Sequence, residues 1–128
     1  MITASAKLLI ALVGSIAVIG VGRAESDPYQ TIKFASQFAI GGVGYAGVRT
    51  HEELAMRELR DYPRGEEQLR NLLRDATPAG QMYALFALRQ LNVRDYANLS
   101  EPYRHSSAVI TRQNGCIVHE EAVPDTIE

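Results

Sequence analysis

The glycine-rich segment 42–47, with the sequence GVGYAG, has the most recognisable spacing of chemically useful residues in this chain. The spacing GxGxxG is typical of a turn that opens a helix and cradles the phosphates of a dinucleotide. The context argues against that chemistry, because the next helix has its own cap and no alternation of strands and helices follows. We interpret the segment as a turn in which backbone approaches backbone. The candidate binding residues that it contributes are Gly42, Gly44, Tyr45 and Gly47.

Cys116 and His119 are three positions apart, a spacing that two ligands of one metal ion can have. Alternation along a strand would place their side chains on opposite faces, and the chain has no second cysteine for a four-ligand zinc site. The sequence therefore predicts no metal site and no cofactor. We expect Cys116 to be half buried and unreactive, with an exposed thiol that links two chains as the alternative. Cys116 is kept as a further binding candidate.

No arrangement for nucleophilic catalysis is recognisable in the sequence. The chain lacks a GxSxG motif, and the adjacency of His105 and Ser106 does not make a catalytic triad. Carboxylates are spread over helical segments with arginines nearby, which is typical of solvated faces rather than of an acid and a base with separated pKa values. We therefore name no catalytic residue and favour a non-enzymatic function.

The first 24 residues have the three parts of a secretory signal peptide. Lys7 supplies positive charge, residues 8–22 form an uncharged run of fifteen, and the triplet GRA that ends at Ala24 has small residues at its first and third positions. We expect cleavage between Ala24 and Glu25, and hence export to the periplasm or secretion. A membrane-spanning helix needs about 20 apolar residues, so the short run favours cleavage, and a retained N-terminal membrane anchor is the alternative.

Size and charge narrow the classes of function. Without the leader, 104 of the 128 residues remain, which suits one domain; we place it at residues 25–119, followed by a flexible acidic tail at 120–128. The remaining chain has 11 basic and 15 acidic residues, a formal charge of −4. This acidity argues against a nucleic-acid partner, which requires a basic face.

Apolar residues recur with helical spacing in four segments, 29–39, 50–62, 66–76 and 77–91. In the second segment Thr50 and Glu53 form a capping box, in which each side chain is expected to bond the backbone N–H of the other residue. Thr77 and Pro78 start the fourth segment. Its stretch MYALFAL is apolar on all sides and is expected to be the centre of the core.

The C-terminal third is expected to contain a hairpin. Residues 93–104 show no clear pattern and are predicted as a loop with short turns, broken by Pro102. β-Branched residues are frequent in 107–112 and 116–119, and the Asn114-Gly115 pair between them is a strong hairpin signal. We place the turn at that pair.

This turn groups the hairpin residues into two faces that are almost equally apolar. One face carries Val109, Cys116 and Val118, and we expect it to cover the helices. The other face carries Ile110 and Ile117 and is expected to point away from the helices.

The run from Phe34 to Val48 has fifteen residues without a charge. Such a run can dip into a membrane or pack on a partner, although it is too short to span a bilayer as a helix. We favour a third interpretation, in which its apolar residues join the core with Leu72 and Leu88, because a small domain needs them there. Membrane contact is otherwise expected only through the leader.

Two resemblances add to these patterns. The segment Glu66 to Leu91, an amphipathic helix followed by a capped turn and an alanine-rich helix, resembles a single HEAT-like helical hairpin. That resemblance implies stacked helix pairs that hold a protein partner. The chain is also similar to small exported bacterial proteins of unassigned function, which contain segments like GGVGYAG, TPAGQMYAL and GCI in this order; here they occupy residues 41–47, 77–85 and 115–117.

Taken as a whole, the sequence predicts a mainly α fold, a compact bundle of three to four helices with a C-terminal β-hairpin. It favours a non-enzymatic exported protein of a bacterial envelope that binds another protein, with immunity or inhibitor proteins as a subclass. One alternative is a small envelope enzyme or ligand carrier that uses the turn Gly41–Gly47, and another is a membrane-anchored protein with an uncleaved leader. An apolar surface patch would favour protein binding, and a polar pocket beside Gly44 would favour the enzyme or carrier.

Overall fold

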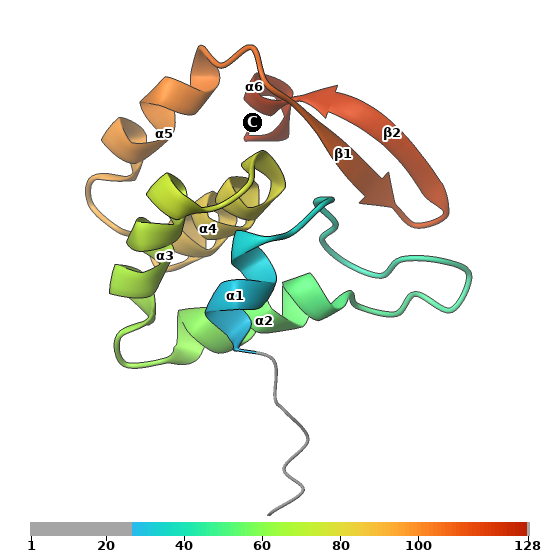
Figure 1. The fold of residues 1–128 in the computed structure, drawn as a ribbon, viewed down its shortest axis with the longest axis horizontal. Coiled ribbons are helices and arrows are strands. Elements are labelled where there is room, and N and C mark those ends of the chain that lie inside the picture. The colour runs from blue at the N-terminus through green and yellow to red at the C-terminus, as the bar shows by residue number, and fades with distance from the viewer. Residues whose placement is uncertain (1–26, 128) are drawn as a thin grey trace, which may run out of the picture.

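The computed structural model describes residues 27–127, which form six helices and one two-stranded antiparallel sheet (Figure 1). The elements in chain order are α1 (Pro28–Lys33), α2 (His51–Asp61), α3 (Gly65–Asp75), α4 (Pro78–Gln90), α5 (Tyr96–Arg104), β1 (Val109–Asn114), β2 (Ile117–Ala122) and α6 (Val123–Thr126). About half of the described residues are helical, so the mainly α class with a C-terminal hairpin is confirmed. The predicted signal peptide and its predicted cleavage site between Ala24 and Glu25 lie outside the described residues.

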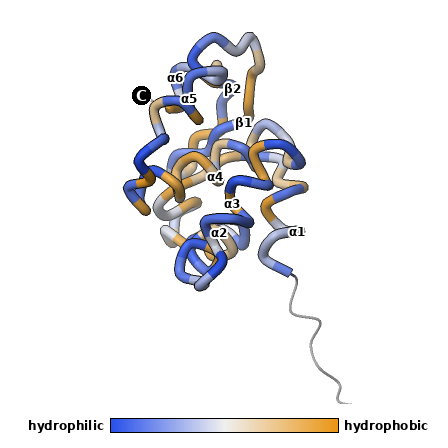
Figure 2. Tube along the Cα trace, turned by 90° about the vertical axis from the view of Figure 1, so that its left-hand side faces the viewer, coloured by the Kyte–Doolittle hydropathy of each residue, from blue (hydrophilic) through white to orange (hydrophobic). Residues whose placement is uncertain are grey.

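Helix α4 lies at the centre of the core, as its all-round apolar sequence predicts. Tyr83, Leu85 and Leu88 are at most 1% exposed, and the helix contacts all five other helices and β1. Figure 2 shows hydrophobic residues gathered where α4 crosses the molecule and hydrophilic residues along the outer turns of α2. Each fully buried leucine contributes about 1.5–3 kcal/mol of hydrophobic stabilisation. Phe86, in contrast, is only partly buried.

Helices α3 and α4 form a closely packed pair at the position of the predicted helical hairpin. Leu69 and Leu72 of α3 are fully buried. The Thr77 hydroxyl caps α4 by accepting the Gly80 N–H at 3.2 Å, as the sequence predicts. A Cβ atom at Gly80 would lie 2.2 Å from the Ile32 carbonyl oxygen, so glycine at this position lets α1 pack directly on α4.

Helix α1 ends at Lys33, well before the predicted end of the first helix at residue 39. Beyond it, Phe38 pairs with β1: its N–H donates to the Thr111 carbonyl at 2.8 Å, and the Gln113 N–H donates to its carbonyl at 3.0 Å. The prediction was wrong because these backbone groups bond to a strand distant in sequence instead of continuing the helix. Ala35 and Phe38 are nevertheless buried, as the helical prediction required.

Residues 96–104 form helix α5, although the sequence predicted a loop broken by Pro102. A proline in a helix removes the hydrogen bond that its N–H would donate one turn back. Tertiary contacts offset this loss, because Ser100 is fully buried, Leu99 packs against the core and the Tyr103 hydroxyl donates to the Leu73 carbonyl at 3.1 Å. Contacts of this kind are not visible in the local sequence.

The hairpin turn lies one residue later than predicted. Asn114 pairs with Ile117, so Gly115 and Cys116 are the two central residues of the turn. Gly115 has a φ of +57°, which suits the first central position of a type II′ turn. The glycine of the Asn-Gly pair therefore begins the turn instead of ending it.

The residues group on the two hairpin faces as expected, but the face that meets the core is the other one. Ile110 is 4% exposed, whereas Val109 on the predicted inner face is 54% exposed. Arg112 shares the face of Ile110, and its guanidinium lies 5.9 Å from the centre of the Phe38 ring. The two faces are similarly apolar, so the pairing of Phe38 with β1 determines which of them packs against the core.

Residues 120–127 are part of the fold, in contrast to the flexible tail that was predicted from residue 120 onward. Strand β2 continues to Ala122, and α6 follows directly. Val123 and Ile127 are buried, and the Val123 N–H donates to the Ala108 carbonyl at 3.0 Å. Two apolar residues among acidic ones therefore close the core beneath α5.

Candidate functional site

Two segments that are distant in sequence meet at one end of the molecule and form what we call the loop–hairpin lobe, residues 41–48 and 114–118 (Figure 1). The Gly44 N–H donates to the Gly115 carbonyl at 2.9 Å, and Val43 forms a bridge with Gly115. The structure thereby brings the candidate binding residues of the glycine-rich segment next to Cys116. Nothing in the sequence indicated that these candidates belong to one surface.

The loop of this lobe closes on itself through two backbone hydrogen bonds between Val43 and Val48, at 2.9 and 3.1 Å. Glycine is required inside it. A Cβ atom at Gly42 would lie 2.5 Å from the Gly47 carbonyl oxygen, and Gly44 has a φ of +68°, which side chains disfavour. The GxGxxG spacing thus accompanies a close backbone approach, in agreement with our interpretation.

A buried tyrosine holds the beginning of the loop. Tyr83 of α4 is fully buried, and its hydroxyl accepts the Ala39 N–H at 2.9 Å and donates to the Ala39 carbonyl at 3.1 Å. Burial raises the pKa of Tyr83 above its ordinary value. Because the hydroxyl satisfies both backbone groups of Ala39, the chain enters the loop from a fixed point in the core.

A buried carboxylate holds the first residue of the loop. Glu53 of α2 is fully buried. It accepts the Gly41 N–H at 3.0 Å and two N–H groups of Arg57 at 2.9 and 3.2 Å, and the Arg49 guanidinium lies 3.7 Å away. A buried charge needs such partners, since unpaired it would be strongly destabilising.

The capping box therefore forms only in part. The Thr50 hydroxyl accepts the Glu53 N–H at 3.1 Å, as predicted. The Glu53 carboxylate is directed to Gly41 and Arg57 instead of returning to the Thr50 N–H. The residue that local sequence rules assign to a helix end thus serves as the link between α2 and the loop.

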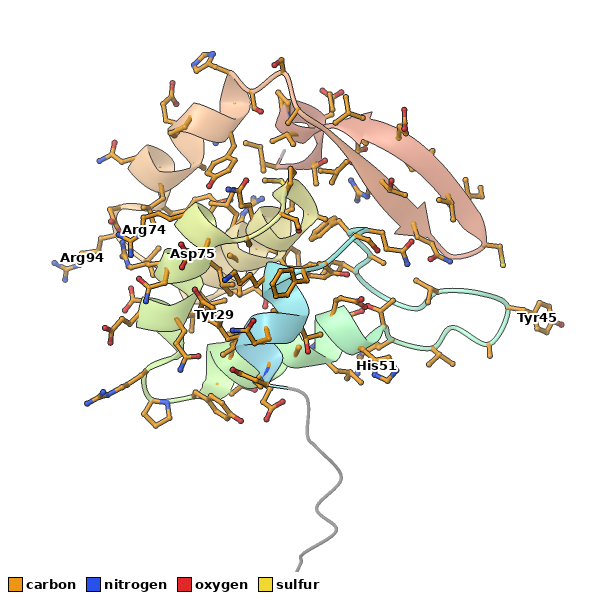
Figure 3. The ribbon with its side chains drawn as sticks, viewed as in Figure 1. Tyr29, Tyr45, His51, Arg74, Asp75 and Arg94 are labelled. Atoms are coloured by element: carbon orange, nitrogen blue, oxygen red, sulfur yellow. The ribbon has the colours of Figure 1, made fainter. Side chains whose placement is uncertain are left out.

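The lobe exposes a group of apolar side chains. Tyr45 is fully exposed, and Val48, Ile117 and Val118 are each more than half exposed. Figure 3 shows Tyr45 at the far end of the loop, pointing away from the body of the protein. Cys116 is exposed as well. The expectation of a half-buried Cys116 is wrong, because the cysteine occupies a central position of the turn and not a strand position against the helices.

The hairpin strand that continues from the lobe carries negative charge. Glu120 is exposed, and Glu121 accepts hydrogen bonds from Arg112 at 2.7 Å and from the Thr126 hydroxyl at 2.9 Å. Burial opposes the ionisation of Glu121, but the bonds from Arg112 and Thr126 outweigh it and hold its pKa below the ordinary value. Glu121 is therefore ionised at neutral pH.

Among residues 27–127 there is no group of three or more His, Cys, Asp and Glu side chains that could hold a metal ion. His119 Nε2 lies 4.0 Å from a carboxylate oxygen of Glu121. The spacing of Cys116 and His119 thus has no third ligand beside it in the part of the chain that is described.

The uncharged run from Phe34 to Val48 divides into two parts. Ala35, Phe38 and Ala39 are buried, in agreement with the prediction that the run joins the core. Val48 and Tyr45 of its second half are exposed on the lobe. No helix within residues 27–127 has the length and hydropathy needed to cross a bilayer.

Three hollows in the described surface, of about 30, 270 and 380 Å³, are lined by residues outside the loop segment 41–48. None of these three hollows is the polar pocket beside Gly44 that would favour an enzyme or ligand carrier.

Sequence reasoning missed the two side chains that hold the loop. A single hydroxyl within the stretch MYALFAL was the available signal for Tyr83, because a buried hydroxyl needs a hydrogen-bond partner. Glu53 had a competing local explanation as part of the capping box, and no signal pointed from it to Gly41.

No protein-family model matches this chain, and the comparisons with curated proteins and with solved structures found no match either. The similarity of residues 66–91 to a HEAT-like hairpin stays an expectation. A conclusion about what this domain binds therefore rests on the geometry of the loop–hairpin lobe.

Proposed function

We propose that this chain is a non-enzymatic exported protein of a bacterial envelope that binds another protein through the loop–hairpin lobe. The observation that carries the proposal is the exposure of Tyr45, Val48, Ile117 and Val118 on two segments joined by backbone hydrogen bonds. Export rests on the signal-peptide pattern of residues 1–24.

The composition of the lobe is that of a protein-binding surface. Apolar side chains are exposed on both segments of the lobe, with Ile117 and Val118 on opposite faces of the hairpin, and exposed apolar surface of this kind is a mark of interaction sites. Tyrosine is enriched at interfaces and is frequent among the few residues that supply most of the binding energy. A projecting Tyr45 best suits a partner with a cleft, the geometry that an inhibitor or immunity protein needs.

The lobe is also held in one conformation before any partner arrives. Tyr83 and Glu53 fix the start of the loop, the Val43–Val48 bonds close it, and Gly44 ties it to the hairpin. A surface that is ordered in advance loses less conformational entropy on binding. The order of the lobe therefore supports a role in binding, rather than that of a solvent-exposed loop that only connects α1 to α2.

Site-specific photo-crosslinking in the producing cell tests the proposal. A photoreactive phenylalanine analogue in place of Tyr45 is expected to give one dominant adduct with an envelope protein. The same analogue in place of Glu67, an exposed residue of α3, is expected to give none, because it lies outside the lobe.

A double substitution, Ile117→Ser with Val118→Ser, tests whether the adduct depends on the hairpin part of the lobe. It should abolish the adduct while leaving the free energy of unfolding within about 0.5 kcal/mol, since both side chains are exposed. Absence of an adduct at position 45, or an adduct that the double substitution leaves unchanged, contradicts the proposal.

A further inference from the structure

The outer edge of β2 has no partner strand among residues 27–127. The sheet contains only β1 and β2, and the other side of β1 is occupied by Phe38. Figure 1 shows β2 on the outside of the hairpin, with β1 between it and the segment that follows α1. A free edge presents backbone groups that can pair with another extended chain.

The register identifies the free backbone groups. Thr111 and Gln113 point away from β2, because they bond to Phe38 on the opposite side of β1. Their register partners on β2 are Glu120 and Val118. In an antiparallel pair, opposed residues direct their N–H and C=O groups either both inward or both outward. Val118 and Glu120 therefore direct theirs outward, where no described residue bonds them.

The side chains along this edge have a simple order. Ile117 and Val118 are apolar and exposed at the lobe end. Glu120 is exposed without an ion pair among the described residues, whereas Glu121, on the opposite face of the strand, is paired with Arg112. The strand has no proline, a residue that commonly blocks edge pairing, and its charged residues are glutamates, which can pair with basic side chains of a neighbouring strand.

Charge decides between the candidate occupants. A second copy of β2 carries the same carboxylates and neither lysine nor arginine, so it offers Glu120 no such cation and is destabilised wherever two glutamates face each other. A strand with Lys or Arg opposite Glu120 gains a cross-strand ion pair instead. The edge therefore selects a basic strand and rejects an acidic one.

We propose that an extended segment of the partner protein adds to the outer edge of β2 as a third, antiparallel strand, with apolar residues opposite Ile117 and Val118 and basic residues opposite Glu120. This inference rests on the proposed function and specifies its binding mode. Backbone hydrogen bonds to Val118 and Glu120 supply affinity, and the order of apolar and basic side chains supplies specificity. Tyr45 and Val48 contact the same partner beyond the end of that strand.

Nuclear magnetic resonance titration of the full chain with synthetic peptides tests the binding mode. The probe is acetyl-Ser-Lys-Lys-Thr-Val-Val-Ser-amide, in which the basic and apolar halves match the reversed order of β2. We expect the amide resonances of Val118 and Glu120 to shift and their hydrogen exchange to slow about tenfold or more, as newly bonded amides do. The same peptide with Glu in place of both Lys is expected not to bind.

Two pairs of variants separate backbone pairing from side-chain contact. Val118→Pro removes one outward N–H and leaves the β1–β2 bonds in place, since proline is tolerated where a strand N–H faces solvent. It should weaken binding of the peptide about tenfold, whereas Val118→Thr should weaken it less. Glu120→Lys should reverse the preference between the basic and the acidic peptide, and Glu58→Lys, on exposed α2 surface, should not.

Three results would overturn the inference. The first is peptide binding that is insensitive to Val118→Pro, or no binding at all. The second is slow exchange of Val118 and Glu120 in the free monomer, which would assign the edge to the chain's own residues 1–26. The third is a dimer that Val118→Pro dissociates, which would assign the edge to a second copy. A crosslink from Tyr45 that persists in any of these cases preserves the proposed function and rejects only this binding mode.

Discussion

Helix α4 and the loop–hairpin lobe are both rich in apolar residues, yet they use them in opposite ways. In α4 the apolar side chains are buried on nearly every side, and that burial stabilises the helix. In the lobe Tyr45, Ile117 and Val118 are exposed, and the segments are held by backbone bonds and by Tyr83 and Glu53 beneath them. Order in the lobe therefore does not depend on hiding its apolar side chains, which leaves them free for a partner.

The largest expected difference between the two regions comes from shortening one aliphatic side chain in each. Leu88→Ala in α4 should lower the free energy of unfolding by about 2–5 kcal/mol, because it removes buried methyl groups and leaves a cavity. Ile117→Ala in the lobe should change it by less than about 0.5 kcal/mol. Denaturant unfolding of both variants measures the contrast, and equal losses would mean that the lobe is stabilised like the core.

The second largest effect is expected at the carboxylate that joins α2 to the loop. Glu53→Gln should cost about 1.5–3 kcal/mol, since the charged hydrogen bonds with Arg57 are lost inside the protein. Hydrogen exchange of the Gly41 amide should accelerate. Glu52→Gln, next to it in sequence and without an ion pair in the described structure, is the control. Unchanged exchange at Gly41 would show that Glu53 stabilises only the helix.

A smaller loss, about 1–3 kcal/mol, is expected for Tyr83→Phe, because both backbone groups of Ala39 lose their partner. This variant should also change how the free energy of unfolding depends on pH in the alkaline range. Burial raises the pKa of Tyr83, so above about pH 10 the unfolded tyrosine ionises while the folded one stays protonated, and stability falls as pH rises. Part of that fall should be missing in Tyr83→Phe and present in Tyr45→Phe; equal alkaline losses in both variants would contradict this role.

The smallest effect on stability is expected at the turn of the hairpin. Cys116→Ser should change the free energy of unfolding by less than about 0.5 kcal/mol, because the side chain is exposed. The thiol of the native chain should react with a small alkylating reagent nearly as fast as that of the unfolded chain. A thiol that reacts only after denaturation would place Cys116 in a covered site and weaken the description of the lobe as a free surface.

Local patterns predicted the elements whose stability comes from neighbouring residues. Thr50 and Thr77 cap helices where the sequence placed them, and the leucine spacing of α3 predicted its buried side. The errors occur where a distant segment supplies the competing interaction. Phe38 pairs with β1 instead of extending α1, and Pro102 stays in a helix because α5 packs on the core.

The amino-acid sequence by itself determined the central helix, the helix caps, the presence of a hairpin and the need for glycine in the segment 41–47. These features follow from spacing and from the preferences of single residues, which act within a few positions. Only the tertiary structure decided that this segment lies beside Gly115, that Glu53 bonds to Gly41, and that Cys116 is exposed. The two contacts join residues from separate elements, so they depend on how the elements pack. Local residue preferences do not determine them. The candidate surface exists only after the chain has closed around α4.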